Sequence, residues 1–553
     1  MKVVLCALNS KYIHTNLAVR YIKAYADAHS KNAECVIVED TVNGNIDETA
    51  EKILAYNPDA VAFSCYIWNI SHILTLCKLV KSANPDIIII LGGPEVSFNP
   101  SEYAALDYVD YVQCGDGEKS MTALFDALAD GSDIPKGFGI CYKNIIEKLY
   151  CEKNLCNIES PYTEEYLSSV KGRIAYMEST RGCPFSCAFC LSGADKGVRY
   201  FSDEYVKNAI MTLWNSGAKT VKFIDRTFNA NKAHCEMIIK FILDNHEKMP
   251  KVCFHFEIAA DILADSTIEL LSKAPKGLFQ IEAGLQSFNH HTLEAVMRKT
   301  DTDKICENVK KLVSFGNIHT HIDLIAGLPY EDFTSFKESF NKAYSVGAHM
   351  LQLCFLKLLH GSRLRDEVEN HGFVYSVEAP YEIISTNWLT ADEMNKLRQV
   401  EDANEKIANS GRFRRSLEYV LTVSGMTPFD LFFGFGKKES MPLDDYTALV
   451  FEYFSSIDGI DKAVLRDRMC IDRLATNKSG KLPKCLQIKD KQLARFTYQL
   501  EINPETAPLK GVKRGVCILY SENKVLYVDY IGDSDEYKMN YIQLDSFAED
   551  NNG

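Results

Sequence analysis

The sequence of 553 residues predicts an α/β protein in three parts: an N-terminal doubly wound parallel sheet, a partial β/α barrel of six strands, and a mixed α+β C-terminal domain. Two successive alternations of strand-like and helix-like segments predict the first two parts. Nearly continuous apolar strands joined by amphipathic helices are typical of parallel sheets. The pattern changes after about residue 385, which marks the third part.

The first alternation covers residues 1–140 and predicts a Rossmann-like domain. Its expected strands are VVLCAL, ECVIVED, AVAFSCY, DIIIILGG and YVDYVQCG. Ligands of such sheets bind outside the carboxyl ends of the strands. The loops at 64–69, 92–96 and 115–120 are therefore candidate binding segments. A connector with little periodicity is expected over residues 141–172.

The second alternation covers residues 173–380 and predicts the barrel. Its expected strands are RIAYMEST, TVKFID, VCFHFEI, GLFQIEAG, HTHIDLIAG and MLQLCFLKL. Chemistry in β/α barrels gathers at the carboxyl ends of the strands. In residues 385–553, helical segments and the aromatic FDLFFGFG precede two expected strands, GVCILYS and KVLYVDYI.

Composition and charge exclude several classes of protein. The formal net charge is −14, and an acidic surface repels phosphate backbones, so nucleic acid is not expected as a partner. The sequence contains no run of about 18 apolar residues, so no membrane span is expected. The chain has 18 cysteines but begins with an expected strand and helix rather than a secretion signal. A reducing cytoplasm is therefore the expected location.

The segment RGCPFSCAFC places Cys183, Cys187 and Cys190 directly after the first barrel strand. Structural zinc normally takes four ligands, whereas a 4Fe–4S cluster held by three thiolates keeps one iron open for another ligand. Pro184 disfavours a helical Cys183, so a loop around a cluster is expected. A zinc scaffold and a non-catalytic Fe–S redox or sensor protein remain as alternatives.

The spacing C-x3-C-x-aromatic-C resembles the signature of the radical S-adenosylmethionine (SAM) superfamily. This resemblance implies that SAM chelates the open iron. It also implies that one electron cleaves SAM to a 5′-deoxyadenosyl radical, which abstracts hydrogen from a substrate. An electron donor such as flavodoxin or ferredoxin is then expected. Phe189, the aromatic residue of the motif, would lie near the adenine.

Two further segments resemble SAM-binding segments of that superfamily. IEAGLQSFN is similar to its E-x-G-x-Q-S stretch, and HIDLIAGLP to its D-x-I-x-G-L-P stretch. KFIDRTF stands where the family often has Gly-Gly-Glu, which is absent here. The SAM-binding residues that the resemblance implies are Phe189, Asp225, Glu282, Gln286, Ser287, Asp323 and Gly327.

The N-terminal domain resembles the cobalamin (B12)-binding domain of a radical SAM subgroup. Gly-Gly-Pro at 92–94 and Gly-Asp-Gly-Glu at 115–118 carry this resemblance, although the family's variant of the second motif is usually Gly-Glu-Gly-Glu. A D-x-H-x-x-G motif that would supply a cobalt-ligating His is not found, and loss of the cofactor stays an alternative. The implied cobalamin-binding residues are Ser64, Gly92, Gly93, Gly115, Gly117 and Glu118.

Together the resemblances imply a radical SAM enzyme that acts on a small molecule. Methylation of an unactivated carbon is the commonest reaction of the cobalamin subgroup. Radical rearrangement or cyclisation, with or without cobalamin, is the alternative among enzymes. The C-terminal part resembles an accessory domain of unknown function and has no motif that we assign to chemistry.

Overall fold

The structure is a computed structural model that describes residues 1–553 except 194–196, 504, 509–510, 531–536 and 545–553. The chain forms two compact units. The N-terminal unit comprises Met1–His349 and Leu353–Ala391, and the C-terminal unit comprises Met350–Gln352 and Asp392–Gly553. Among the described residues, no helix is both long and apolar enough to cross a membrane.

The first sheet of the N-terminal unit has the strand order β2-β1-β3-β4-β5-β6. Its first five strands are parallel and β6 is antiparallel, which confirms the predicted doubly wound sheet. The strand order reverses between β1 and β3, where such sheets bind ligands. The strands are β1 (Lys2–Asn9), β2 (Glu34–Thr41), β3 (Ala60–Ser64), β4 (Ile88–Gly92), β5 (Tyr111–Gln113) and β6 (Ile140–Cys141).

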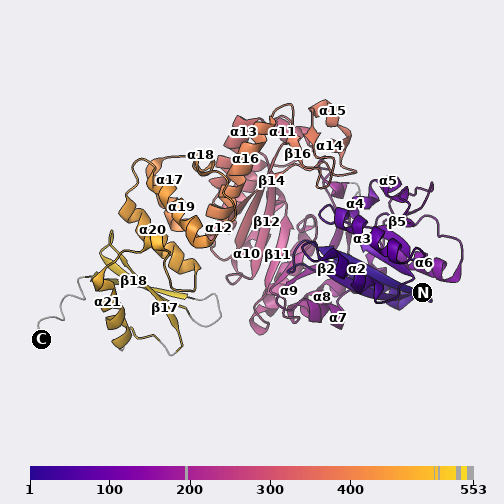
Figure 1. Cartoon of the computed structure of the whole chain (residues 1–553), viewed down its shortest axis with the longest axis horizontal. Helices are drawn as coiled ribbons and strands as arrows, with labels where there is room; N and C mark the ends of the chain where they lie inside the picture. The colour runs from indigo at the N-terminus through magenta and orange to yellow at the C-terminus, as the bar shows by residue number, and fades with distance from the viewer. Residues whose placement is uncertain (194–196, 504, 509–510, 531–536, 545–553) are drawn as a thin grey trace, which may run out of the picture. The chain divides into compact units, whose positions relative to one another are not determined.

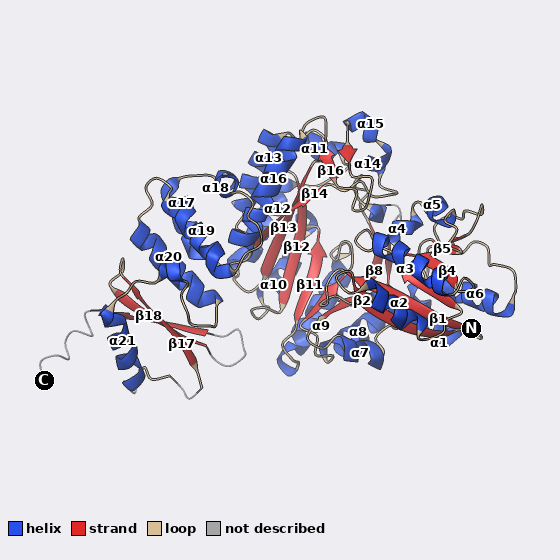
Figure 2. Ribbon diagram, viewed as in Figure 1, coloured by secondary structure: helices blue, strands red, loops and turns tan. Residues whose placement is uncertain are grey.

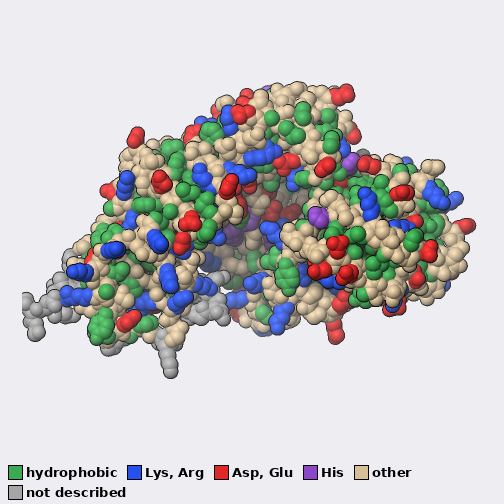
Figure 3. Space-filling model, in the orientation of Figure 1, with side chains coloured by type: hydrophobic (Ala, Val, Ile, Leu, Met, Phe, Trp, Pro, Cys, Tyr) green, Lys and Arg blue, Asp and Glu red, His purple; other side chains and the backbone are tan. Residues whose placement is uncertain are grey.

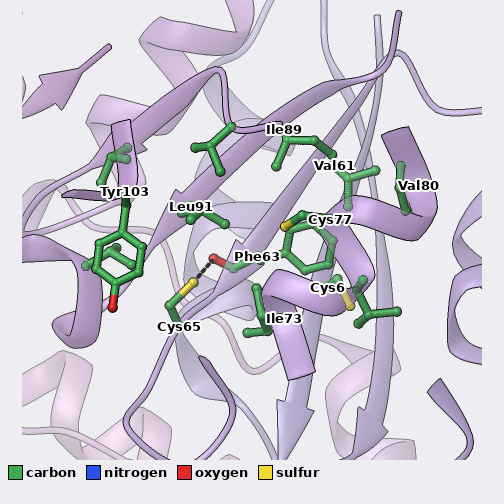
Figure 4. Packing of buried hydrophobic residues seen from close by; sticks show 14 of the residues in the cluster. Cys6, Val61, Phe63, Cys65, Ile73, Cys77, Val80, Ile89, Leu91 and Tyr103 are labelled. Carbon is green, nitrogen blue, oxygen red and sulfur yellow. Dashed lines mark hydrogen bonds between the residues drawn. The ribbon is translucent and has the colours of Figure 1, made fainter. Parts of the chain in front are cut away.

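Six helices accompany this sheet (Figure 1). They are α1 (Leu17–His29), α2 (Ile46–Leu54), α3 (Ile70–Ala83), α4 (Pro94–Ser97), α5 (Pro100–Ala104) and α6 (Glu118–Asp130). Strand β1 contributes alternate side chains to the two hydrophobic clusters of the domain. Figure 4 shows one of them, in which Cys6, Phe63 and Cys77 pack together. These thiols are core side chains, and burial raises the pKa of Cys6.

The second sheet has the strand order β14-β13-β12-β11-β10-β7, with all six strands that the sequence predicts. Pairings from β7 to β13 are parallel. Figure 2 shows the strands of this sheet with helices alongside. The strands are β7 (Ile174–Met177), β10 (Thr220–Phe223), β11 (Cys253–Ile258), β12 (Phe279–Gln286), β13 (His319–Ala326) and β14 (Met350–Phe355).

An antiparallel hairpin, β8 (Thr180–Cys183) with β9 (Gly197–Tyr200), interrupts the alternation between β7 and β10. The sequence pattern did not predict these short strands. A second small pair, β15 (Val374–Tyr375) with β16 (Ile383–Ser385), follows the sheet. The helices of this part are α7 (Glu164–Ser169), α8 (Asp203–Trp214), α9 (Lys232–Asn245), α10 (Asp265–Ser272), α11 (His290–Ala295), α12 (Thr302–Ser314), α13 (Phe333–Tyr344), α14 (Arg363–Asp366) and α15 (Val368–His371).

The two faces of the second sheet differ in polarity. Along β12, Phe279, Ile281 and Ala283 are buried, whereas Gln280 and Glu282 are only partly covered. Parallel sheets are usually buried on both faces. The partly covered polar face, called the inner face below, is therefore the side on which this sheet meets solvent or a ligand.

The C-terminal unit has mixed α+β structure, as predicted. Its antiparallel sheet contains β17 (Lys513–Leu519), β18 (Lys524–Tyr530) and β19 (Tyr537–Gln543), and β19 follows the two strands that were expected. Residues 545–553 of the predicted domain lie outside the described residues. The helices from its start are α16 (Ala391–Ala403), α17 (Arg414–Ser424), α18 (Pro428–Phe435), α19 (Leu443–Ser455), α20 (Lys462–Thr476) and α21 (Lys491–Ile502).

We predict that Phe256→Ala destabilises the N-terminal unit by about 3–5 kcal/mol, because the change leaves a cavity in the core. The Phe256 ring is fully buried and stacks on Phe228 at 4.0 Å between ring centres. Thermal unfolding of the two variants would measure the effect. Phe315→Ala, at a ring that is 38% exposed, is the control and should change stability by less than about 0.5 kcal/mol. Equal effects of the two changes would contradict this account of the core.

Candidate functional site

The cysteine motif lies in the hairpin that follows β7. Cys183 ends strand β8, and Cys187 and Cys190 lie in the segment between β8 and β9. Cys187 is buried, and the other two thiols are partly exposed. Burial raises the pKa of Cys187, and the nearby Cys190 and Cys183 add to this shift. The three thiols are thus electrostatic neighbours on one short loop, called the cysteine loop below (residues 183–190).

Backbone hydrogen bonds hold the cysteine loop on the barrel. The amide of Ala188 donates to the carbonyl of Val296 at 2.8 Å, and the amide of Leu364 donates to the carbonyl of Ala188 at 3.0 Å. Arg298 donates from Nη1 to Cys187 Sγ at 3.6 Å. A cationic group beside a thiol favours the thiolate, which is the form that binds iron.

Among the described residues, no group of three or more His, Cys, Asp or Glu side chains is arranged as a ready metal site. The chemistry of the loop nevertheless fits an iron–sulfur cluster. Three thiols share one loop, and an arginine contacts one of them. Three thiolates suit a cluster with one open iron better than a closed zinc site.

Asp225 lies just beyond the carboxyl end of β10 and is fully buried. Its carboxylate accepts hydrogen bonds from the backbone amide of Ser179 at 3.0 Å, from the Ser179 hydroxyl at 2.7 Å and from the Thr180 hydroxyl at 2.5 Å. Burial raises its pKa, and these hydrogen bonds oppose the shift. Asp225 therefore holds the chain between β7 and β8 and thereby positions the cysteine loop.

Glu282 lies on the inner face of the barrel, in the middle of β12. Its Oε2 is 3.0 Å from His255 Nε2 and 3.4 Å from Lys222 Nζ. Burial opposes ionisation, but the hydrogen bond to His255 and the charge of Lys222 lower the pKa of Glu282 to about 2. The carboxylate is therefore ionised at neutral pH and faces the same side as Asp323 of β13.

Two other expected SAM-binding residues carry buried polar atoms without a partner among the described residues. They are Asp323, through Oδ1, and Gln286, through Oε1. Burial raises the pKa of Asp323, and the charges of Glu282 and Glu257 add to the shift. A buried polar atom without a hydrogen bond is costly, so these two atoms point to a ligand that supplies the missing donors.

Ser287 has its partners within the protein. It is fully buried, and its hydroxyl donates to Glu331 Oε1 at 2.7 Å. Ser339 donates to the same oxygen at 2.8 Å. Burial raises the pKa of Glu331 to about 7. Gly327 follows β13 with φ of 92°, a left-handed conformation that glycine adopts without strain. Phe189 is partly buried within the cysteine loop.

Histidines of the inner face were not identified from the sequence. His255 of β11 is buried and pairs with Glu282. His321 Nε2 is 2.9 Å from His319 Nδ1, and burial lowers the pKa of His321 to about 4. The alternation H-x-H-x-D in β13 could have placed these rings beside Asp323. Figure 3 shows a hollow over β11 and β12 where histidine and acidic side chains gather.

At the carboxyl ends of β1 and β3, Ser64 accepts a hydrogen bond from Asn16 Nδ2 at 3.1 Å. The loop after Ser64 carries an aromatic pair, in which Tyr66 and Trp68 stack with ring centres 4.3 Å apart. Trp68 is 46% exposed. An exposed, braced aromatic face at the topological switch point suits a large flat ligand such as cobalamin.

The fold itself explains why glycine is required at positions of the two expected cobalamin motifs. A Cβ on Gly93 would lie 2.5 Å from the carbonyl oxygen of Cys65, and one on Gly115 would lie 2.1 Å from that of Tyr150. Both glycines have positive φ. A Cβ on Gly92 would make an ordinary contact with Gln113 at 3.5 Å, whereas a Cβ on Gly117 would lie only 3.0 Å from Ile22. Glu118 is buried and pairs with Arg181.

Three family models match consecutive parts of the chain. They are the B12 binding domain over residues 3–125, the radical SAM superfamily over 177–343, and a protein family of unknown function, DUF4080, over 369–510. The chain therefore contains a B12-binding domain, a radical SAM domain and a DUF4080 domain, in this order along the sequence.

Two curated relatives are methyltransferases by name. The chain is 25% identical over 418 residues to the cobalamin-dependent radical SAM methyltransferase TokK of Streptomyces tokunonensis, covering 67% of this chain and 57% of the relative. It is 27% identical over 328 residues to the 2-(S-pantetheinyl)-carbapenam-3-carboxylate methyltransferase of Streptantibioticus cattleyicolor, covering 53% and 46%. The matches thus span about half the length of these relatives.

Solved structures show the same fold at low sequence identity. The cobalamin-dependent SAM radical enzyme OxsB, with aqua-cobalamin bound, matches with a TM-score of 0.61 and 15% identity, covering 86% of this chain and 74% of that chain. The radical SAM methyltransferase TsrM from Kitasatospora setae matches with a TM-score of 0.54 and 15% identity, covering 68% and 77%. The radical SAM domain implies a 4Fe–4S cluster and SAM, and the B12-binding domain implies cobalamin.

We predict that Glu331 makes the protein less stable as pH rises from about 4.5 to about 7. Its folded-state pKa of about 7 lies above its ordinary value, so the folded state binds more protons in this window. The resulting loss is on the order of 3 kcal/mol and is complete above the folded-state pKa. Glu331→Gln should remove this loss, so the variant should gain thermal stability relative to the wild type between pH 5 and pH 8.

Glu338→Gln is the matched control, since Glu338 lies on the exposed side of α13. It should keep the wild-type pH profile of the thermal midpoint. A Glu331→Gln profile that runs parallel to the wild type would show that Glu331 does not titrate in this window.

Proposed function

We propose that this protein is a radical SAM methyltransferase that uses cobalamin to methylate an unactivated carbon of a small molecule. When bound, the cluster and SAM would supply a carbon-centred radical, and cobalamin would supply the methyl group. An electron donor such as flavodoxin or ferredoxin would reduce the cluster. The observation that carries the proposal is a three-cysteine loop beside a polar barrel face, in one compact unit with a B12-type sheet.

Some residues near the cysteine loop would bind the cluster, and others would hold the binding residues in place. Cys183, Cys187 and Cys190 would hold the cluster, and Arg298 would favour the thiolate of Cys187. Asp225, although expected to contact SAM, is fully buried and already accepts hydrogen bonds from Ser179 and Thr180, so we assign it a supporting role.

The inner face would bind SAM. Glu282 is ionised and can accept a hydrogen bond from a cationic amino group. Asp323 Oδ1 and Gln286 Oε1 are buried acceptors without partners among the described residues, and the polar end of SAM would provide donors for them. Phe189 would pack on the adenine. Asp323 and Gln286 are assigned to SAM because their buried oxygens lack donors among the described residues, and Glu282 is assigned to SAM because of its negative charge.

Cobalamin would lie at the carboxyl ends of β1 and β3. The stacked pair Tyr66 and Trp68 presents an exposed aromatic face there, next to Ser64. The backbone at Gly92 and Gly93, at the end of β4, lies on the same edge of the sheet. The relative from Streptantibioticus cattleyicolor is named as the methyltransferase of a small molecule, 2-(S-pantetheinyl)-carbapenam-3-carboxylate. A substrate held between the B12-type and radical SAM domains would reach both cofactors.

We predict that anaerobically reconstituted protein transfers the methyl group of methyl-labelled SAM to cobalamin and also forms 5′-deoxyadenosine under reductant. Cys183→Ala should abolish 5′-deoxyadenosine formation, because a cluster needs all three thiolates to leave one iron open for SAM. Chromatography of the small molecules and the cobalamin spectrum measure both products.

Cys156→Ala is the control, since Cys156 is an exposed thiol in the connector. It should retain both products. Formation of 5′-deoxyadenosine without any methylated cobalamin would reject methyl transfer and favour a radical rearrangement or cyclisation.

We predict that Glu282→Ala weakens SAM binding by about 10- to 100-fold while iron content stays unchanged. A charge-assisted hydrogen bond contributes about 1.5–3 kcal/mol, and Glu282 is not placed among the cluster ligands. Equilibrium dialysis with the reconstituted protein measures the affinity. Glu294→Ala, at an exposed carboxylate of α11, should bind SAM normally. An unchanged affinity in Glu282→Ala would exclude a contact with the cofactor.

A further inference from the structure

The Gly-Asp-Gly-Glu motif at 115–118 of the B12-type domain contacts the cysteine hairpin of the radical SAM domain. Glu118 Oε1 lies 2.5 Å from Arg181 Nη2, and Asp116 Oδ2 lies 2.6 Å from Arg199 Nη1. Arg181 belongs to β8, two residues before Cys183, and Arg199 belongs to β9. The motif therefore reaches the two strands that carry the cysteine loop.

The two arginines lie directly opposite each other in the hairpin. Like charges at directly opposite positions destabilise a strand pair, and a two-stranded hairpin is marginal by itself. Asp116 lies between them, because its Oδ1 is 3.5 Å from Arg181 Nη1 while its Oδ2 pairs with Arg199. One carboxylate of the first domain thus neutralises a repulsion within the second.

The contact is largely buried. The side chains of Glu118 and Arg181 are 5% and 12% exposed. Glu178, just before the hairpin, also pairs with Arg181 at 2.6 Å. The Arg181 guanidinium lies 5.2 Å from the ring centre of Tyr21 on α1. Removing the charge of Glu118 would leave the buried Arg181 guanidinium with fewer carboxylate partners, which costs free energy because the charge stays desolvated.

Each residue of the Gly-Asp-Gly-Glu motif makes a contact within the protein. Gly115 lets the chain pass against the carbonyl of Tyr150. Asp116 also accepts a hydrogen bond from the backbone amide of Glu152 at 2.8 Å, which fixes its carboxylate. Gly117 passes close to Ile22 of α1. Glu118 begins helix α6 and points its carboxylate at Arg181.

We infer that Asp116 and Glu118 form a clasp, with Arg181 and Arg199, that positions the cysteine loop on the B12-type domain. The sequence resemblance assigned Glu118 to cobalamin, whereas its partner is a side chain two residues from a cluster ligand. The clasp fixes the hairpin stem, so the orientation of the cluster toward the first sheet is set by contacts between side chains. Its consequence for turnover rests on the proposed function, but its existence does not.

The clasp predicts that changes in the first domain loosen backbone in the second. Hydrogen–deuterium exchange of the full chain, reconstituted with iron and sulfide and without added cobalamin, tests this. Asp116→Asn and Glu118→Gln should each speed exchange of amides in 178–183 and 197–200 by about tenfold or more. Both substitutions keep side-chain size. The double-mutant cycle of Glu118→Gln with Arg181→Gln should be strongly non-additive, since one pair is lost in either variant.

Glu51→Gln removes an exposed carboxylate from α2 of the same domain and is the matched control. It should leave exchange in both segments unchanged. The reduced cluster of Glu118→Gln should also give a broadened electron paramagnetic resonance spectrum at unchanged iron content, because the loop is no longer held in one position. Titration of Asp116→Asn and Glu118→Gln with hydroxocobalamin then measures whether their cobalamin affinity has changed.

Unchanged exchange in 178–183 in both Asp116→Asn and Glu118→Gln would overturn the clasp. If cobalamin affinity fell in those same variants, the motif would belong to the cofactor site instead. None of these measurements requires turnover. A protein that showed the expected exchange but no methyl transfer would therefore keep the clasp and reject only the proposed function.

Discussion

A buried carboxylate at the end of one barrel strand fixes the point from which the chain leaves the sheet toward the cysteine loop. Asp225 follows β10, and the groups that donate to it belong to Ser179, which precedes β8, and to Thr180, the first residue of β8. Since β7 and β10 are hydrogen-bonded neighbours, this carboxylate joins two strand ends at one edge. Without these donors it would be a desolvated charge, so the chain cannot move away cheaply. The position of the cysteine loop depends on this constraint.

The barrel sheet keeps one face polar, and that face requires partners. Glu282 Oε2 lies 3.0 Å from His255 Nε2 and 3.4 Å from Lys222 Nζ. Asp323 and Gln286 have buried oxygens that remain without donors among the described residues. A sheet face that was only structural would carry apolar residues, as the opposite side of β12 does. The arrangement therefore combines an ionised carboxylate beside Lys222 and His255 with buried acceptors that have no donor in the described part of the chain.

The strands and the cysteine motif could be predicted because their signals are local. Apolar periodicity located every strand of the two parallel sheets except β6, and the spacing of Cys183, Cys187 and Cys190 after the first barrel strand made them candidate cluster ligands. The hairpin β8–β9 could not be predicted, because its strands have only four residues each, include Gly182 and Gly197, and show no alternation of apolar and polar residues. The partners of Asp116 and Glu118 could not be predicted either, since their ion pairs join residues more than 60 positions apart in the sequence. Only tertiary packing brings such residues together.

The difference between satisfied and unsatisfied groups separates residues that hold the structure from those available to a ligand. Ser287 resembles a SAM-binding residue, but its hydroxyl is already bonded to Glu331. Asp323 resembles one equally, yet one of its oxygens is buried without a donor among the described residues. The same distinction applies in the first domain, where Glu118 is paired and Trp68 keeps an exposed ring. A family motif shows which residues occur together but not what each residue does. The contacts of each residue in the folded chain therefore decide which role is assigned to it.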